Sequence, residues 1–309
     1  MKILFTGATG VLGKASLPLL VADGHDVTGI FRSEEETEWL EGVGARPARV
    51  DLFDPAAISQ AMSEMDTVIH FATAIPPQRA MKSRSAWNMN DRLRSAATAN
   101  LVDAALANGV ERLIQQSVAF VYADGGDLWL DESAPVDPVW DVLDSALTAE
   151  SHVERFRATG GTGVTLRLTR LYGPGKASGD YIASVRNREM PIIGKGDNYV
   201  SSIHVDDAAT ALARAVTAPD GTYNVTDDMP MRSSDNLRAL ADALGAPTPR
   251  RVPRWLAGIA VGKAAALLTV SHRVSNQAFR SATGWAPAFP SAAEGWAHIV
   301  ARRGDRQPA

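Results

Sequence analysis

The sequence predicts an α/β protein with a doubly wound parallel sheet and a smaller, discontinuous C-terminal lobe. Over roughly the first 170 residues, short apolar runs alternate with longer helical patterns. Continuous apolar runs are typical of strands buried on both faces, and their alternation with helices indicates parallel pairing through right-handed crossovers. After that, segments such as YGPGKASGD at 172–180 are rich in glycine, proline and polar residues. Such segments are typical of loops around a pocket.

Each element follows from a local pattern. The predicted strands are KILFTG (2–7), DVTGIFR (26–32), a third strand ending in RVDLFD (49–54), TVIHFAT (67–73), RLIQQSVAFVY (112–122), GVTLRLTRLYG (163–173) and TYNVT (222–226). The main predicted helices are 13–24, 94–109 and 139–150. We therefore expect a dinucleotide-binding domain of residues 1–172 and 203–228. Residues 173–202 and 229–303 would form the lobe that binds the substrate.

Composition limits the function classes. The chain has 309 residues, a net charge of -4 and no cysteine, so we expect neither a nucleic-acid partner nor an anionic membrane, and no thiolate zinc site or disulfide. The N-terminus lacks the pattern of a signal peptide, which favours the cytoplasm. The apolar segment 255–270 is short for a membrane span and has Lys263 at its middle. It is predicted to be a buried helix.

The segment TGATGVLG (6–13) predicts a nucleotide-binding loop, because it follows the first strand and opens the first helix. Gly7 permits a tight turn, Gly10 lets the backbone approach a pyrophosphate, and Gly13 lets helix and strand pack closely. Free backbone N–H groups and the positive helix end would hold the phosphates. The loop residues expected to contact the nucleotide are Gly7, Thr9, Gly10, Val11, Leu12 and Gly13.

The end of the second strand bears on which nucleotide binds. Arg32 and Ser33 stand where a carboxylate usually meets the ribose hydroxyls of NAD. A guanidinium there favours the 2′-phosphate of NADP, so NADP is the expected cofactor and NAD the less favoured one. The acidic run at 34–36 is the counter-argument, because it could supply a carboxylate.

Further cofactor contacts are expected at the ends of the third and fourth strands. Asp51 is placed to accept a hydrogen bond from the adenine amino group, or alternatively to cap the following turn, and Leu52 to pack on the ring. Ala72 and Thr73 should line the cofactor. His70, within the same apolar run, is predicted to be a hydrogen-bonded core residue.

Taken together, the fragments TGATGVLG, VIHFAT, QQSVAFVYAD, RLYGPG, SIHVDDAA and TYNVTDD resemble the extended short-chain dehydrogenases/reductases, in the NAD-dependent epimerase/dehydratase group. The resemblance also covers Asn90 and the segment SHRVSNQAFRSATGWAPAFPS, so it runs almost end to end. It implies a Rossmann fold, catalysis on a small-molecule substrate and, as is common in the family, a homodimer. It also implies that Pro174 contacts the nicotinamide.

The family's catalytic pair is missing. The resemblance implies a Tyr-x-x-x-Lys motif on the helix that ends near Glu150, yet Val142 and Ala146 stand at those positions. No tyrosine lies between Tyr122 and Tyr172, and no lysine between Lys82 and Lys176. The remaining catalytic candidates are Ser117, which falls near the family's serine although a count from Tyr122 favours Val118 for it, and Tyr122 itself.

Other polar and aromatic candidates have structural alternatives. Asp144 or Ser145 could reach the pocket, and Tyr172 could face the substrate or pack. His204, Asp206 and Asp207 are expected to be structural, with one aspartate capping the next helix, and no spacing indicates a metal site. Trp87, Trp129 and Trp140 favour a flat or apolar substrate, whereas Arg186 and Arg188 could serve a nucleotide sugar.

Three functions follow from this sequence. The first is an NADP(H)-dependent oxidoreductase with an atypical site, acting on a small carbonyl or hydroxyl compound. The second is an isomerase, epimerase or dehydratase that keeps and recycles its cofactor. The third is a non-catalytic module that senses the nucleotide or binds a partner.

Overall fold

The structure is a computed structural model that describes residues 1–77, 80–261 and 264–304. Its centre is a parallel sheet of seven strands in the order β12-β7-β5-β4-β1-β2-β3. The strands are β1 (Lys2–Thr6), β2 (Asp26–Phe31), β3 (Arg46–Arg49), β4 (Thr67–His70), β5 (Arg112–Val118), β7 (Thr162–Leu168) and β12 (Gly221–Val225). The predicted doubly wound α/β fold is confirmed.

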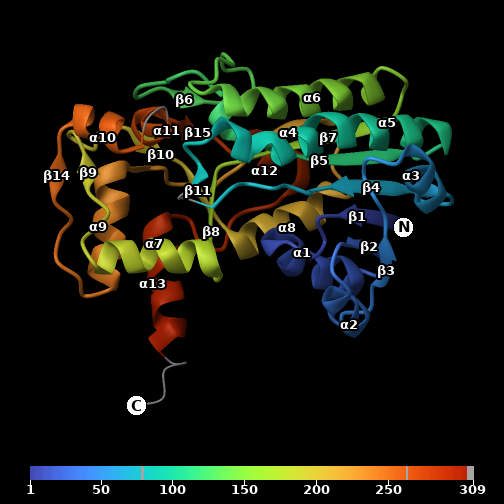
Figure 1. Cartoon of the computed structure of the whole chain (residues 1–309), viewed down its shortest axis with the longest axis horizontal. Helices are drawn as coiled ribbons and strands as arrows, with labels where there is room; N and C mark the ends of the chain where they lie inside the picture. The colour runs from blue at the N-terminus through green and yellow to red at the C-terminus, as the bar shows by residue number, and fades with distance from the viewer. Residues whose placement is uncertain (78–79, 262–263, 305–309) are drawn as a thin grey trace.

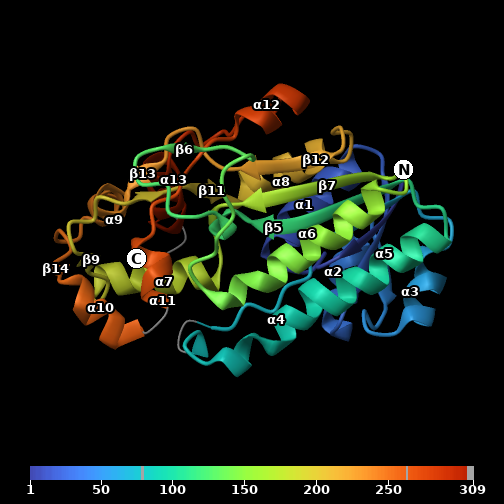
Figure 2. The ribbon, with the colours of Figure 1, turned by 90° about the horizontal axis from the view of Figure 1, so that it is seen from above.

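Helices cover both faces of this sheet (Figure 1). One layer contains α1 (Val11–Ala22) and α8 (Val205–Ala215), and the other α3 (Pro55–Met62), α5 (Thr98–Ala107) and α6 (Asp144–Arg157). In the second layer α5 and α6 lie side by side (Figure 2). Along β1, Ile3 and Phe5 pack in the core beside α1 and α8, while Leu4 packs in the core beside α3 and α5. Because successive side chains alternate between faces, a strand buried on both sides must be apolar throughout.

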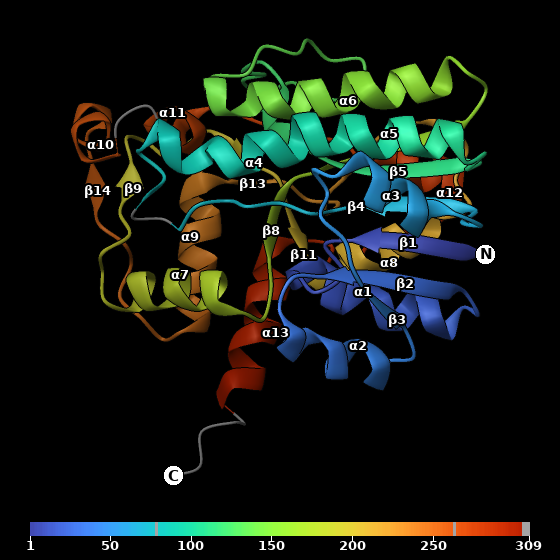
Figure 3. The ribbon, with the colours of Figure 1, turned by 45° about the vertical axis from the view of Figure 1, so that its right-hand side comes forward.

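The smaller lobe lies at the end of the sheet opposite the N-terminus (Figures 1 and 3). Its main helices are α7 (Lys176–Arg186), α9 (Ser233–Ala243) and α13 (Ala292–Gly304), which share an apolar core. β1 starts at residue 2, beside the N-terminus, at the end of the sheet away from the lobe (Figure 1). The carboxyl ends of β1 and of the strands parallel to it therefore face the lobe. That edge is where open α/β sheets bind ligands.

Short elements connect the sheet to the lobe. The strands are β6 (Trp129–Leu130), β8 (Arg170–Tyr172), β9 (Ile192–Ile193), β10 (Tyr199–Val200), β11 (Ser202–His204), β13 (Met231–Arg232), β14 (Arg251–Val252) and β15 (Arg273–Val274). The remaining α-helices are α2 (Thr37–Gly42), α4 (Asn88–Arg92), α10 (Arg254–Val261), α11 (Ala264–Thr269) and α12 (Gln277–Thr283). The lobe draws on separate parts of the chain, as predicted, while the exact domain boundaries stay a prediction.

Two predicted helices differ from the structure. The segment 139–150 begins with a 3-10 turn at Asp141–Leu143, and α6 runs on to Arg157. The expected single buried helix over 255–270 is wrong, because α10 and α11 are separate helices. In addition, the side chains of Trp255 and Ile259 are 65% and 75% exposed. Lys263 lies outside the described residues, and within these no helix has both the length and the apolarity that a membrane crossing requires.

Candidate active site

The glycine loop between β1 and α1 has the geometry of a phosphate-binding loop. Gly7 has φ +82°, and a Cβ there would lie 2.6 Å from the backbone carbon of Phe71. A Cβ on Gly13 would lie 2.2 Å from the carbonyl oxygen of Gly7, so helix and loop touch. Gly10 is exposed, and no side chain caps the N-terminus of α1. The N–H groups there are left open for an anion, so these residues fit a dinucleotide pyrophosphate.

The end of β2 places a carboxylate beside this loop. Glu36 accepts hydrogen bonds from the backbone N–H groups of Arg32 and Ser33, at 3.2 and 3.4 Å. Burial opposes ionisation of Glu36, yet these N–H groups, the Thr9 hydroxyl and the Arg32 charge together hold its pKa below the ordinary value. The structure thus brings Arg32, Ser33 and Thr9 together around Glu36. Glu36 belongs to the acidic run at 34–36 that the sequence offered as a source of a carboxylate, and the nucleotide contacts of all four residues stay predictions.

The other predicted cofactor contacts lie along the same edge. The Asp51 side chain accepts a hydrogen bond from the N–H of Phe53 at 2.9 Å and so closes the turn after β3, while Leu52 is buried in the core. The backbone of Phe71 and Ala72 lies against Gly7. Ala72 and Thr73 are half-buried after β4, and Pro174 is exposed between β8 and α7. The cofactor roles of these residues stay predictions.

Ser117 and Tyr122 belong to a buried polar network. The Ser117 hydroxyl donates to Glu150 at 2.6 Å, and the Arg167 guanidinium donates to both oxygens of that carboxylate at 2.9 and 2.7 Å. Arg167 also donates to the Tyr122 hydroxyl at 2.9 Å, which in turn donates to Asn224 at 2.8 Å. Both candidate hydroxyls are therefore engaged inside the protein, in an arrangement that stabilises the packing of α6 on the sheet.

The surroundings of Tyr122 also raise the pKa of its hydroxyl, which makes it a weaker acid. Burial raises the pKa of the Tyr122 hydroxyl, and the neighbouring Arg167 charge opposes that change without cancelling it. A general acid works best when its pKa lies near the operating pH. The catalytic assignment of Ser117 and Tyr122 stays a prediction that this geometry does not favour.

The positions of the absent tyrosine and lysine are filled by apolar packing. Val142 and Ala146 are fully buried in a cluster with Trp87 and Trp140, whose rings meet edge to face at 5.4 Å. Val118, Val121 and Leu143 complete the buried part of this cluster. Ser145 is also buried, and the exposed Asp144 points to solvent. Within the described chain, α6 and the cluster therefore present no side chain with a catalytic proton at either position.

Two tryptophan expectations change as a result. Trp87 and Trp140 form core packing and do not line an open substrate pocket, while Trp129 is half exposed under the Arg273 guanidinium at 4.2 Å. Neither Arg186 nor Arg188 lines the cavity described below. The tryptophan that lines this cavity is Trp296, on α13.

His70 is a core histidine, as predicted. Its two ring nitrogens lie 2.5 Å from the Thr6 hydroxyl and 3.2 Å from the Leu93 carbonyl. Burial lowers its pKa to about 4, so the ring is neutral near neutral pH.

A buried cation that the sequence did not single out lies near His70. Arg94 is 3% exposed within a π-helical turn at Leu93–Ala97, and its Nε has no hydrogen-bond partner among the described residues. Burial lowers its pKa to about 10, opposed by the charges of Asp91 and Glu150. Because Asp91, Arg92 and Ser95 are also polar, the local sequence gave no signal that Arg94 would be buried.

The histidine before α8 and the two aspartates in its first turn are structural. The His204 ring accepts a hydrogen bond from the N–H of Asp206 at 3.2 Å, so the histidine caps the helix and not the expected aspartate. Asp207 accepts from the N–H groups of Ala288 and Phe289 at 2.7 and 3.0 Å and so fixes the C-terminal segment. Across the described residues, no cluster of histidine, aspartate and glutamate has the makings of a metal site.

The lobe contains a cavity of about 400 Å³. Its wall is mostly apolar and aromatic, and Tyr172, the last residue of β8, precedes the loop that holds Pro174. The principal lining residues are Arg170, Tyr172, Tyr181, Ile192, Leu256 and Trp296. A pocket of this size suits a small organic molecule. Tyr172 lines the pocket and also packs on the Trp296 ring at 4.6 Å, so its packing role is seen and its contact with a substrate stays a prediction.

Known proteins resemble the chain over its whole length. It is 34% identical to a 3-diazoavenalumate denitrifying reductase from a Streptomyces species, over 96% of this chain and 99% of that protein. Its fold matches a Thermus thermophilus UDP-glucose 4-epimerase in complex with NAD (22% identity, TM-score 0.78, 99% and 100% of the two chains). It equally matches the human epimerase family protein SDR39U1 with NADPH (20% identity, TM-score 0.78, 97% and 99%).

The profile of the NAD-dependent epimerase/dehydratase family matches residues 3–226, from the first strand to the end of the sheet. The relatives include reductases and epimerases, consistent with a nicotinamide-dependent enzyme. The chain therefore belongs to the NAD-dependent epimerase/dehydratase family.

Proposed function

We propose that this protein is an NADP(H)-dependent reductase whose substrate accepts hydride without a proton from the helix that normally supplies one. The observation that carries the proposal is the burial of Val142 and Ala146 in an apolar cluster. The engagement of Ser117 by Glu150 and of Tyr122 by Asn224 supports it, because the two hydroxyls that the sequence offered as catalytic candidates are also occupied.

The chemistry then favours an electrophile more reactive than a ketone. Reduction of a carbonyl develops charge on oxygen, and a positioned acid typically contributes about 10²–10⁴-fold to the rate. An aromatic diazo compound needs no such acid. Hydride adds a C–H bond to the ring carbon, the C–N bond breaks, and its electron pair leaves with N₂. The oxygen on the neighbouring ring carbon, which is conjugated with the diazo group in the starting compound, becomes a phenolate. This phenolate takes a proton from water.

Resemblance to the denitrifying reductase supports this choice of substrate class. That protein's name describes reduction of a diazo compound with loss of nitrogen, and the likeness covers 96% of this chain. The bound nicotinamide would supply the hydride. The Gly7 to Gly13 loop would hold its pyrophosphate, and the closing lobe would exclude water.

NADP is the proposed cofactor because of the residues that follow β2. The exposed guanidinium of Arg32 and the N–H groups of Arg32 and Ser33 form a cradle for an anion. Glu36 accepts from these N–H groups, so a 2′-phosphate would take the place of this carboxylate. The fold match to a protein solved with NADPH agrees with this proposal, and the match to one solved with NAD keeps the alternative open.

The second candidate is an epimerase or dehydratase that retains NAD. The Glu36 carboxylate beside the loop favours it, because a carboxylate can accept hydrogen bonds from the ribose hydroxyls. Such an enzyme would return its hydride and show no net consumption of cofactor. A nucleotide-sensing module without catalysis would bind cofactor tightly and turn over nothing.

The deciding experiment uses NADPH carrying deuterium at C4 and an ortho-diazo derivative of 4-hydroxycinnamate. We expect oxidised cofactor, released N₂ and one deuterium on the ring carbon that bore the diazo group. A 3-acetyl analogue should be reduced far more slowly. The reaction without protein and the Gly10→Val variant control for direct reduction in solution. Unchanged diazo compound in the presence of bound NADPH would overturn the proposal.

The same assay examines the sequence-derived catalytic candidates. Ser117→Ala and Tyr122→Phe should keep turnover within a few-fold, because both hydroxyls stabilise the packing of α6. If either variant folds and binds NADPH normally yet loses turnover, that hydroxyl is the proton donor.

A further inference from the structure

The cavity in the lobe is lined by a positive charge, Arg170, whose side chain has no ion-pair or hydrogen-bond partner among the described residues. Arg170 and Glu189 are the charged residues among its described lining, and Glu189 is exposed at the surface. Arg170 is half-buried and makes no ion pair or side-chain hydrogen bond with another described residue. A guanidinium held against an apolar wall without a partner is a site for an anion.

Arg170 also lies at a junction. Arg170 also lines a second, narrower hollow together with Ala119 and Phe120, which follow β5, and His272. Burial raises the pKa of the Tyr181 hydroxyl, and the Arg170 charge opposes that change, so the guanidinium lies close to this tyrosine of the large cavity. The cation therefore stands between the carboxyl edge of the sheet and the lobe.

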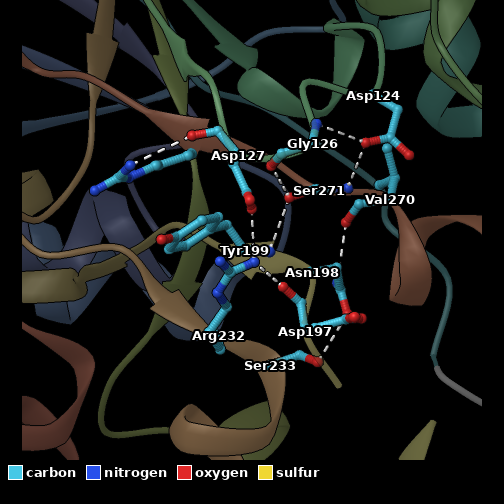
Figure 4. Close-up of polar contacts among 11 residues, drawn as sticks. Asp124, Gly126, Asp127, Asp197, Asn198, Tyr199, Arg232, Ser233, Val270 and Ser271 are labelled. Atoms are coloured by element: carbon cyan, nitrogen blue, oxygen red, sulfur yellow. Dashed lines mark hydrogen bonds and ion pairs between the residues drawn. The ribbon is translucent and has the colours of Figure 1, made fainter. Parts of the chain in front are cut away.

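The neighbouring cations are already engaged (Figure 4). Arg232 pairs with Asp127 at 2.8 Å, and the carbonyl of Asp127 accepts from Arg273 at 3.3 Å. Both guanidinium groups also stack on the Tyr199 ring, at 4.0 and 4.7 Å. The positive charges of Arg232 and Arg273 are therefore already paired with groups of the protein itself.

The same region fixes one wall of the cavity. Ser271 donates to the backbone at Gly126 and accepts from the N–H of Tyr199, and Ser233 donates to Asn198 at 2.8 Å (Figure 4). Because Ser233 lines the cavity and Tyr199 and Val200 line the narrow hollow, these contacts hold the surroundings of Arg170 rigid. A rigid wall reduces the entropy that binding must offset.

We propose that Arg170 binds the carboxylate of a flat aromatic acid whose ring lies in the lobe cavity against Tyr172, Tyr181 and Trp296. This inference rests on the proposed reductase function and names the substrate class of that site. A volume of about 400 Å³ accommodates one substituted ring with a short acidic arm. A nucleotide diphosphate sugar fits the same wall poorly, because its two phosphates need several cations and the described lining offers one, opposed by Glu189.

The test measures binding apart from turnover. The protein saturated with NADP is titrated by calorimetry with 4-hydroxycinnamate and with its methyl ester, which lacks the carboxylate charge and carries one additional methyl group. Wild type should prefer the acid. Arg170→Met should weaken binding of the acid by about 10–100-fold, the range for a hydrogen bond to a charged group, and leave the ester unchanged. The matched control is Arg186→Met, an exposed arginine on α7 that does not line the cavity.

A second variant keeps the test decisive if Arg170→Met folds poorly. Glu189→Gln removes the negative charge at the cavity and should strengthen binding of the acid while leaving the ester unchanged. Equal loss of acid and ester in Arg170→Met, or unchanged binding of the acid, overturns the proposal. If the acid and ester are discriminated as expected but the diazo compound is not reduced, the carboxylate site stands and the proposed reaction fails.

Discussion

At the residue scale, the carboxylate of Glu36 accepts from the N–H groups of Arg32 and Ser33, which are the groups proposed to meet the 2′-phosphate of NADP. Glu36→Gln removes the competing charge and should improve the preference for NADPH over NADH by about tenfold, equivalent to roughly 1.4 kcal/mol. Arg32→Asp should lower that preference, since it puts a carboxylate where a cation stood. Fluorescence titration with both nucleotides gives the ratio.

A neighbouring residue provides the control. Glu35 is exposed and carries the same charge, so Glu35→Gln should move the ratio far less than Glu36→Gln. If Arg32→Asp weakens both nucleotides equally, Arg32 does not recognise the 2′-phosphate and the NADP assignment loses its main support.

The glycines of the phosphate loop separate a packing role from a binding role. A methyl group on Gly13 would collide with the carbonyl oxygens of Gly7 and Ala8, at 2.2 and 2.4 Å. Gly13→Ala should therefore cost about 1–3 kcal/mol of stability even without nucleotide. Gly10→Val should chiefly abolish nucleotide binding, because a Cβ there meets only the Gly7 carbonyl at 3.2 Å within the protein and would block close approach of the proposed pyrophosphate to the exposed backbone.

Thermal melting with and without NADP distinguishes the two effects. Gly13→Ala should melt lower in both conditions. Gly10→Val should keep a melting temperature near that of the wild type and lose the increase that the nucleotide gives. Normal nucleotide affinity in Gly10→Val would remove the basis for the phosphate-loop assignment.

At the element scale, Val142 and Ala146, which stand at the positions of the family's tyrosine and lysine, are packed in a buried apolar cluster. Ala146 has no exposed surface and packs with Trp87 and Trp140. Ala146→Lys should destabilise the protein by about 4 kcal/mol, since full burial lowers a lysine pKa by about three or more. Adding Val142→Tyr should therefore give an unstable protein and no gain in carbonyl reduction. Urea unfolding and a ketone assay measure both outcomes.

The same helix supplies a matched control. Ser151 is exposed on α6, so Ser151→Lys should leave the unfolding free energy nearly unchanged. A stable Ala146→Lys/Val142→Tyr protein that reduces ketones would show that the cleft can reopen around a conventional acid, and that the apolar cluster is not a barrier to this chemistry.

At the scale of the whole molecule, the sequence predicted the sheet better than the site. Runs such as ILF at 3–5 are apolar at every position, which only a strand buried on both faces requires, so the fold could be inferred locally. The absence of tyrosine and lysine from α6 was also readable. What replaced them was not, because the network of Ser117, Glu150 and Arg167 joins residues up to 50 positions apart. That Arg170 has no partner among the described residues could not be predicted either, because its surroundings come from segments far apart in the sequence.

The junction between sheet and lobe also sets how stability depends on pH. Asp227, two residues after the end of β12 at Val225, is 2% exposed. Burial raises its pKa well above 3.8, and the charge of Asp228 raises it further. The folded protein thus holds this proton more tightly than the unfolded chain does. As the pH rises from 3.8 to the raised pKa of Asp227, the free energy of unfolding should fall by about 1.4 kcal/mol for each pH unit. Above that pKa it should remain at the lower value.

Asp227→Asn should remove this penalty. The variant is expected to be more stable than wild type at pH 7, and the difference between them should grow with pH across that window. Urea unfolding at a series of pH values gives this difference directly. Asp228→Asn is the contrasting variant, because Asp228 accepts from Asn276 and pairs with Arg280, at 2.9 and 2.6 Å, so its loss should destabilise. A difference between wild type and Asp227→Asn that does not change with pH would mean that Asp227 is ionised in the folded protein.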